Sequence, residues 1–156
     1  MRLWLPAGLL MASTILAAGC ATGQSSTMSG ADNIAARQKL MKEQGAAMRS
    51  IGDKVKAGQI QAVAVDAEKL AVTARRIPTL FPQGSLNPDT SRAKPEIWQK
   101  WSEFEGHAKS LETKAAALAT TARAGNAQAT GAAATDLGKT TCGACHNAFR
   151  GPELKK

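Results

Sequence analysis

The 156-residue sequence is poor in the aromatic side chains that stack on nucleic-acid bases and in the histidines and cysteines that build most metal or thiol sites. It has no tyrosine, aromatic residues make up 4% of it, and it contains two histidines and three cysteines. Its net charge of +8 comes from basic residues that are scattered, with no run of lysine or arginine. Few aromatics and no basic run argue against a nucleic-acid partner. No segment shows the apolar–polar alternation of a strand, so we expect an all-α protein.

Two of the three cysteines belong to one motif close to the carboxyl end. The chain reads Cys142-Gly143-Ala144-Cys145-His146 there, a complete C-x-x-C-H. This spacing is the attachment signal for a c-type haem. On a helix the two thiols point to the same side, where they can bond to the two vinyl groups of one porphyrin. The sequence therefore predicts one covalent haem c, bound through Cys142 and Cys145, with His146 as the proximal iron ligand.

Other uses of these cysteines are weaker alternatives. A zinc site usually needs a second pair of ligands, and His107, the other histidine, has no cysteine or histidine beside it. A thiol–disulfide redox pair would normally follow an early strand in a βαβ pattern. A disulfide would leave His146 without a role. We therefore prefer the haem interpretation.

The first twenty residues have the pattern of an export signal. Arg2 gives a short positive region, and a mostly apolar run follows up to Gly19-Cys20. The sequence around Cys20 resembles a bacterial lipobox, in which the cysteine is lipidated and becomes the first mature residue. We therefore expect a signal peptide over residues 1–19 and a lipidated flexible tether over residues 20–31. The alternative is cleavage behind Ala21, which would leave a soluble protein.

These features together predict a bacterial periplasmic protein that is lipid-anchored to a membrane. Haem attachment to C-x-x-C-H takes place outside the bacterial cytoplasm, so the motif and the export signal support each other. The lipid on Cys20 is the only membrane contact we expect. A basic surface in this compartment favours electrostatic steering towards acidic redox partner proteins.

Residues 32–156 are predicted to form one domain, an antiparallel four-helix bundle whose last helix carries the haem. The expected helices run from about Asn33 to Lys56, from Gln59 to Ile77, from Pro95 to Gly125 and from Ala127 to Arg150. Asp32 or Asn33 is the expected cap of the first helix. The first three helices carry apolar residues at spacings that bury one stripe. A long, proline-rich connection between the second and third helices suggests a loop that serves a site.

Four segments of the chain resemble the class II c-type cytochromes, which comprise cytochrome c′ and its methionine-ligated low-spin relatives. The segments are Arg37 to Lys42, Pro78 to Pro82, Lys94 to Trp98 and Cys142 to Arg150, and their order and spacing agree with the family. The resemblance covers nearly all of the mature domain. It implies a four-helix bundle with covalent haem, often a homodimer packed through its first two helices.

The resemblance also implies roles for three residues outside the haem motif. Met41, four residues after Arg37, would face the side of the haem opposite His146, where low-spin relatives use a methionine as the sixth ligand. In cytochrome c′ proper an apolar side chain fills that pocket and the iron stays five-coordinate. Arg37 resembles the family arginine near a haem propionate. Arg150 resembles the basic residue one helical turn beyond the histidine, which acts on the proximal pocket or favours the helix C-terminus.

Two functions follow, and neither is an enzyme. The first is single-electron transfer with His146 and Met41 as axial ligands. The second, implied by the resemblance, is a five-coordinate protein that binds nitric oxide while Met41 only packs over the iron. Such an apolar pocket would disfavour ligands that need hydrogen-bond donors. Met48 and His107 are the alternative sixth ligands.

Overall fold

The computed structural model describes residues 28–154, which are helical and contain no strand, as predicted. The elements are α1 (Gly30–Lys56), α2 (Val63–Ala74), the 3-10 helix η1 (Pro78–Leu80), α3 (Glu96–Gln99), α4 (Trp101–Arg123), α5 (Ala127–Asp136), the π-helix η2 (Leu137–Gly143) and α6 (Ala144–Phe149). No helix in this part of the chain is both long and apolar enough to cross a membrane. The predicted signal peptide over residues 1–19, Cys20 and most of the predicted tether lie outside the described residues.

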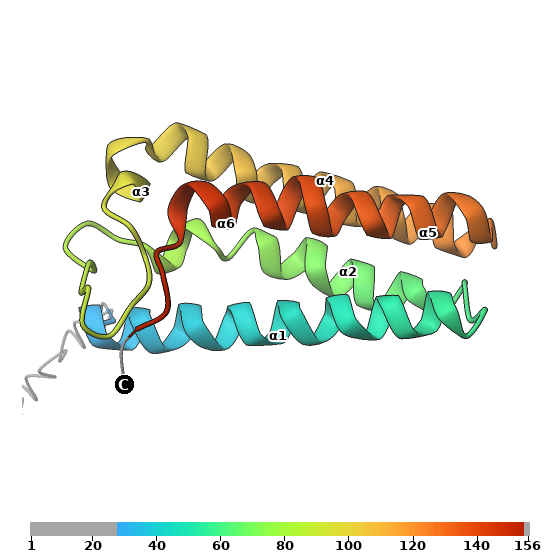
Figure 1. Ribbon diagram of the computed structural model, residues 1–156, viewed down its shortest axis with the longest axis horizontal. Coiled ribbons are helices and arrows are strands. Elements are labelled where there is room, and N and C mark those ends of the chain that lie inside the picture. The colour runs from blue at the N-terminus through green and yellow to red at the C-terminus, as the bar shows by residue number, and fades with distance from the viewer. Residues whose placement is uncertain (1–27, 155–156) are drawn as a thin grey trace, which may run out of the picture.

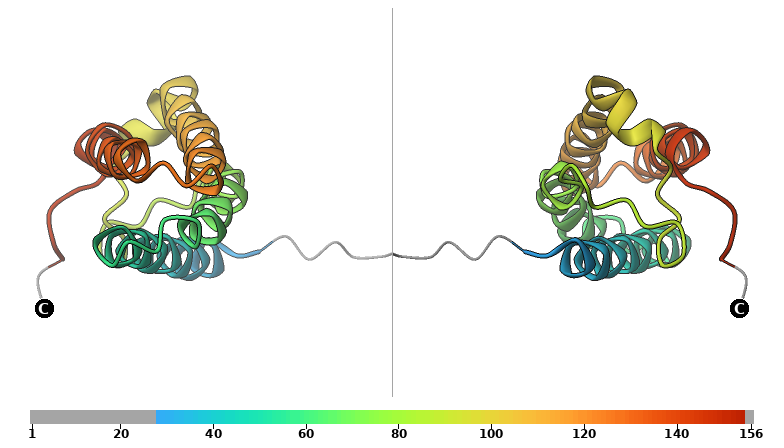
Figure 2. Two further views of the ribbon diagram at one scale, coloured as in Figure 1. Left: turned by 90° about the vertical axis from the view of Figure 1, so that its right-hand side faces the viewer. Right: turned by 90° about the vertical axis from the view of Figure 1, so that its left-hand side faces the viewer.

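Four rods run alternately in opposite directions and form the predicted antiparallel bundle (Figure 1). The rods are α1, α2, α4 and the continuous series α5, η2 and α6, and Figure 2 shows them around a common interior. Tight turns that contain Gly58 and Gly125, with φ of 71° and 74°, lead into α2 and α5 at one end. The start of α1, the end of α6 and the long loop from η1 to α3 therefore meet at the opposite end.

The helix ends depend on local hydrogen bonds. α1 begins at Gly30, before the predicted start, because Ser29 and Asp32 form a capping box. The Ser29 hydroxyl accepts from the Asp32 N–H at 3.1 Å, and the Asp32 carboxylate accepts from the Ser29 N–H at 3.2 Å. The prediction of Asp32 or Asn33 as the cap was therefore wrong. α2 is shorter than predicted because both of its ends tighten into i→i+3 turns.

The predicted third helix is broken at Lys100, which has φ −119° and ψ 47°. The indole N–H of Trp98, on α3, donates to the carbonyl oxygens of Phe81 and Pro82, both at 3.0 Å. Phe104, in the first turn of α4, packs against the ring of Phe81 with centroids 4.9 Å apart. Because of the bend, Trp98 before the break and Phe104 after it both contact Phe81 in the loop. The straight helix predicted from Pro95 did not include these contacts.

The fourth rod is not the continuous α-helix that was predicted, because η2 interrupts it and contains Cys142, whereas Cys145 and His146 lie on α6. Gly143 packs closely on the Gly138 carbonyl oxygen, from which an added Cβ would lie 3.4 Å away. The Thr140 hydroxyl donates to the Asp136 carbonyl oxygen at 3.0 Å. π-helical turns often occur at functional sites, and this one sets the register of the haem motif.

The apolar interior comes mainly from the predicted stripes. Its fully buried side chains include Leu40, Ile51, Val63, Leu70, Ile97, Leu118 and Leu137. A polar contact joins α1 to α2 beside this core: the carboxylate of Asp66 accepts hydrogen bonds from Lys54 Nζ and Ser50 Oγ, both at 2.6 Å. Burial alone would raise the pKa of Asp66, but these hydrogen bonds hold it below its ordinary value.

Replacing Asp66 by asparagine should lower the free energy of unfolding by about 1 kcal/mol at neutral pH. A carboxyl whose pKa is depressed in the folded state stabilises above its unfolded pKa and loses this effect as the pH falls through the folded pKa. The difference between wild type and Asp66→Asn in urea denaturation should therefore vanish in acid. Asp53→Asn, on the exposed face of α1, is the control. An equal loss in both variants, or one that persists in acid, contradicts this account.

Candidate functional site

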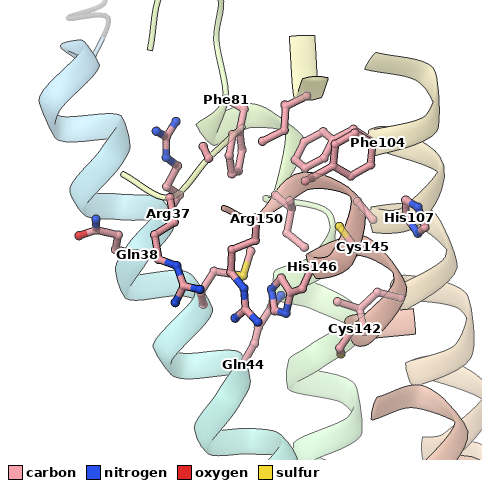
Figure 3. Close-up of a pocket in the computed structure, with 18 of the residues that line it drawn as sticks. Arg37, Gln38, Gln44, Phe81, Phe104, His107, Cys142, Cys145, His146 and Arg150 are labelled. Atoms are coloured by element: carbon pink, nitrogen blue, oxygen red, sulfur yellow. The ribbon is translucent and has the colours of Figure 1, made fainter. Parts of the chain in front are cut away.

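A cavity of about 360 Å³ lies at the end of the bundle where the long loop meets α1, α4 and α6. The six residues predicted to contact the haem all line it: Arg37, Met41, Cys142, Cys145, His146 and Arg150. Much of the remaining wall is apolar and consists of Ile77, Phe81, Ala93, Ile97, Phe104, Ala108, Leu111 and Phe149. The fold therefore gathers the predicted site residues around one largely apolar space (Figure 3).

The haem motif forms one wall of the cavity. Cys142, Cys145 and His146 are half-buried, and Figure 3 shows them on the last rod of the bundle. Burial lowers the pKa of His146, and the positive charges of Arg150 and Arg92 lower it further. The imidazole is therefore neutral at neutral pH, which is the form that binds a metal.

The same wall does not resemble a thiol–disulfide redox centre. Burial raises the pKa of Cys142, and burial together with the neighbouring Cys142 raises the pKa of Cys145 to about 11. Reactive cysteines in redox enzymes have lowered pKa values instead. In residues 28–154, moreover, no three histidine, cysteine or acidic side chains gather closely enough to hold a bare metal ion. These observations favour the haem interpretation over the redox-pair and zinc alternatives.

Met41 lines the cavity from α1, whereas His146 lines it from α6, and Met41 is half-buried. Of the two alternative sixth ligands, Met48 does not line the cavity and packs beside Gly138 of η2. His107 does line it, from α4, with its ring edge-on to Phe149 at a centroid distance of 5.8 Å. The geometry thus favours Met41 over Met48 as the residue that faces His146.

Arg37 is a buried charged group of the site whose hydrogen-bond acceptors are all uncharged. Its side chain is 3% exposed, and its guanidinium lies 4.6 Å over the ring of Phe81. It donates to Ser85 Oγ at 3.2 Å, to the Ser85 carbonyl oxygen at 3.0 Å and to Ser91 Oγ at 2.8 Å. These acceptors are all neutral. Burial lowers the pKa of Arg37, yet arginine keeps its charge in proteins, so a carboxylate ligand would relieve a costly buried charge.

Thr141 provides a second unsatisfied group on the same cavity. It directly precedes Cys142, is 3% exposed, and its Oγ1 has no hydrogen-bond partner in the part of the chain that the structure describes. Buried polar atoms normally have partners. A haem fits this site, because its apolar ring suits the wall and its two carboxylates offer acceptors to Arg37 and other donors. Thr141 could not be recognised from the sequence, apart from its place next to the motif.

The long loop holds the end of α6, which sequence reasoning did not predict. The Lys94 N–H donates to the Phe149 carbonyl oxygen at 3.0 Å, and the Gly151 N–H donates to the Arg92 carbonyl oxygen at 2.7 Å. Arg150 lies between these bonds, just past the end of α6, with an exposed side chain at the edge of the cavity. Its expected effect on the proximal pocket thus has a structural basis in its charge beside His146.

Comparison with known proteins agrees with this site. The sequence model described as Cytochrome C′ matches residues 32–150.

The chain belongs to the cytochrome c′ family. It is therefore a class II c-type cytochrome, a haem protein whose cofactor is covalently bound haem c.

Individual relatives cover almost the whole domain. A cytochrome c′ of Pararhodospirillum photometricum is 34% identical over 117 residues, which span 73% of this chain and 92% of that protein. A cytochrome c-556 of Agrobacterium tumefaciens is 32% identical over 130 residues, 81% of this chain and 100% of that protein. The crystal structure of cytochrome c′ from Thermochromatium tepidum superposes with a TM-score of 0.68 at 29% identity and covers 80% of this chain and 98% of that one.

Arg37→Gln should lower the reduction potential of this cytochrome by several tens of millivolts. A buried positive charge beside the haem favours the reduced iron by about 1 kcal/mol at the effective dielectric constant of a protein. Spectroelectrochemical titration of the haem-loaded protein measures the shift. Lys39→Gln removes the same charge from an exposed position on the same helix and should change the potential much less. Equal shifts in the two variants would mean that Arg37 does not act on the haem.

Proposed function

We propose that the protein is a periplasmic single-electron carrier whose one haem c is bonded to Cys142 and Cys145, with His146 as proximal ligand and Met41 as sixth ligand. The observation that supports this most directly is the placement of His146 and Met41 on different elements, α6 and α1, of one largely apolar cavity. The haem supplies the one-electron couple. The protein contributes its ligands, its charges and the exclusion of water.

The chain's own residues suit this role. The neutral imidazole of His146 is ready to bind iron, and the thioether of Met41 is a soft ligand that raises a haem potential. With both axial positions filled, the centre would change little on gaining one electron. Phe81, Phe104 and Phe149 close the wall beside it with edge-on ring contacts. The low dielectric constant of this apolar wall would also influence the reduction potential of the haem.

The second candidate is a gas-binding protein in which Met41 only packs. Met41 is half-buried and packs against the apolar core, so it fills space whether or not it binds iron. One structurally similar protein is a nitric oxide complex of a cytochrome c′ variant from Alcaligenes xylosoxidans, with a TM-score of 0.70 and 25% identity over 81% of this chain. That likeness supports the alternative without favouring it over the first.

Met41→Ala separates the two candidates. If Met41 binds the iron, the wild type should have a low-spin optical spectrum with a methionine-to-iron(III) charge-transfer band, and the variant should become high-spin and bind carbon monoxide. Met48→Ala, a methionine outside the cavity, should leave the spectrum low-spin. A wild-type spectrum that is already high-spin would support the gas-binding function. A low-spin spectrum that survives Met41→Ala would point to His107 as the ligand.

We further propose a lipid anchor on Cys20 in the periplasm, on the basis of the signal and lipobox pattern. Cys20→Ala should move the protein from the membrane fraction to the soluble periplasmic fraction, because a lipidated cysteine is then absent. Immunoblots of fractionated cells measure this, with the wild-type protein as the reference. Continued membrane association of the variant would contradict the anchor.

Partners are expected at two surfaces. Lys42, Arg92 and Arg150 all line the cavity, and their charges would steer an acidic redox partner towards the haem edge. Val65 and Val72 on α2 are 68% and 58% exposed, one heptad apart. An exposed apolar pair of this kind on α2 supports the homodimer through the first two helices that the family resemblance implies.

A further inference from the structure

The wall that α1 contributes to the cavity is more polar than the sequence led us to expect. Gln44 lines the cavity three residues after Met41, so the two side chains share one face of α1. Its side chain is 8% exposed. In Figure 3 it lies on the side of α1 that faces His146. Gln44 therefore places an amide beside the position proposed for the sixth ligand.

Thr73 on α2 fixes the orientation of this amide. Gln44 Nε2 donates to Thr73 Oγ1 at 3.2 Å, and the Thr73 hydroxyl donates its own proton to the Lys69 carbonyl oxygen at 2.8 Å. Because the Thr73 hydroxyl proton is already used in the bond to Lys69, Thr73 Oγ1 can only accept a hydrogen bond from the amide nitrogen. The hydrogen-bond network thus assigns Nε2, rather than Oε1, to the side of Gln44 that contacts Thr73.

Gln44 keeps hydrogen-bonding capacity after this contact. An amide nitrogen carries two protons, and only one is used by Thr73. Within residues 28–154, neither the second N–H nor Oε1 of Gln44 makes a hydrogen bond. These groups remain free to hydrogen-bond to a molecule in the cavity, which is the space that this side chain lines. The arrangement suits a small ligand with an acceptor atom.

We propose that Gln44, positioned by Thr73, donates a hydrogen bond to small ligands of the haem iron on the α1 side of the pocket. This would favour anionic ligands that accept a hydrogen bond over carbon monoxide, contrary to the apolar pocket expected from the sequence. The inference rests on the proposed placement of the haem between Met41 and His146. It makes Gln44 a residue that determines ligand specificity wherever Met41 does not bind the iron, as in the gas-binding candidate.

The test uses the haem-loaded protein with Met41→Ala, so that the iron is open to ligands. Gln44→Met removes the amide and keeps the side-chain length. Gln128→Met is the matched control, because it makes the same change at an exposed position of α5 that does not line the cavity. Thr73→Val keeps Gln44 but removes its anchor. Intact mass first confirms that each variant carries one haem, and far-ultraviolet circular dichroism that it is folded.

Two ligands are then compared: cyanide on the oxidised iron and carbon monoxide on the reduced iron. Gln44→Met should weaken cyanide binding relative to carbon monoxide by about tenfold, the effect of losing one hydrogen bond to a charged acceptor. The infrared stretch of bound carbon monoxide should rise in wavenumber, because the donor that polarised it is gone. Thr73→Val should broaden that infrared band and shift it part of the way towards its position in Gln44→Met. Gln128→Met should change neither quantity.

The outcomes separate this inference from the proposed function. If Gln44→Met matches Gln128→Met in both the affinity ratio and the infrared band, Gln44 does not contact the ligand and the inference is wrong. The same holds if carbon monoxide does not bind the haem-loaded Met41→Ala protein. A protein without covalent haem would overturn the proposed function itself, and this inference with it. If Gln44→Met does not fold, an unchanged band in Thr73→Val overturns the inference.

Discussion

The buried charge of Arg37 is the constraint on which the functional end of the bundle depends. A guanidinium that is 3% exposed needs acceptors on every side, and the long loop supplies them through Ser85 and Ser91. These bonds join α1 to the long connection between α2 and α3. Because these acceptors are neutral, the positive charge of Arg37 still lacks a negative partner. The propionates of a haem carry such a charge.

From Arg37 a series of aromatic contacts leads to the haem motif. The guanidinium covers Phe81, the Phe81 ring meets Phe104 edge-on at 4.9 Å, and Phe104 meets Phe149 edge-on at 5.5 Å. Phe149 is three residues beyond His146 on α6. Backbone hydrogen bonds between residues 92–94 and 149–151 fasten the same helix end to the loop. One continuous series of contacts thus connects the cavity walls that come from α1, the loop, α4 and α6.

Much of this could be predicted from the sequence, for identifiable reasons. The haem motif depends on covalent spacing, and the helices depend on apolar periodicity, so both are local patterns that a sequence displays. The family resemblance located Arg37 and Met41, and the structure places both on the cavity. The break at Lys100 and the π-helix before Cys145 could not be predicted, because each depends on contacts or close approaches that form only in the folded chain. Gln44 was missed for the same reason: its partner Thr73 lies on another helix.

The central claim is that one haem is covalently bound through Cys142 and Cys145 on this cavity. Intact mass spectrometry of the protein, expressed with a haem-attachment system, tests it most directly. The account predicts a coloured protein whose mass exceeds that of the polypeptide by one haem, and a Cys142→Ala/Cys145→Ala variant without this increase. A colourless protein with the mass of the bare chain, or an increase that survives loss of both cysteines, would contradict it.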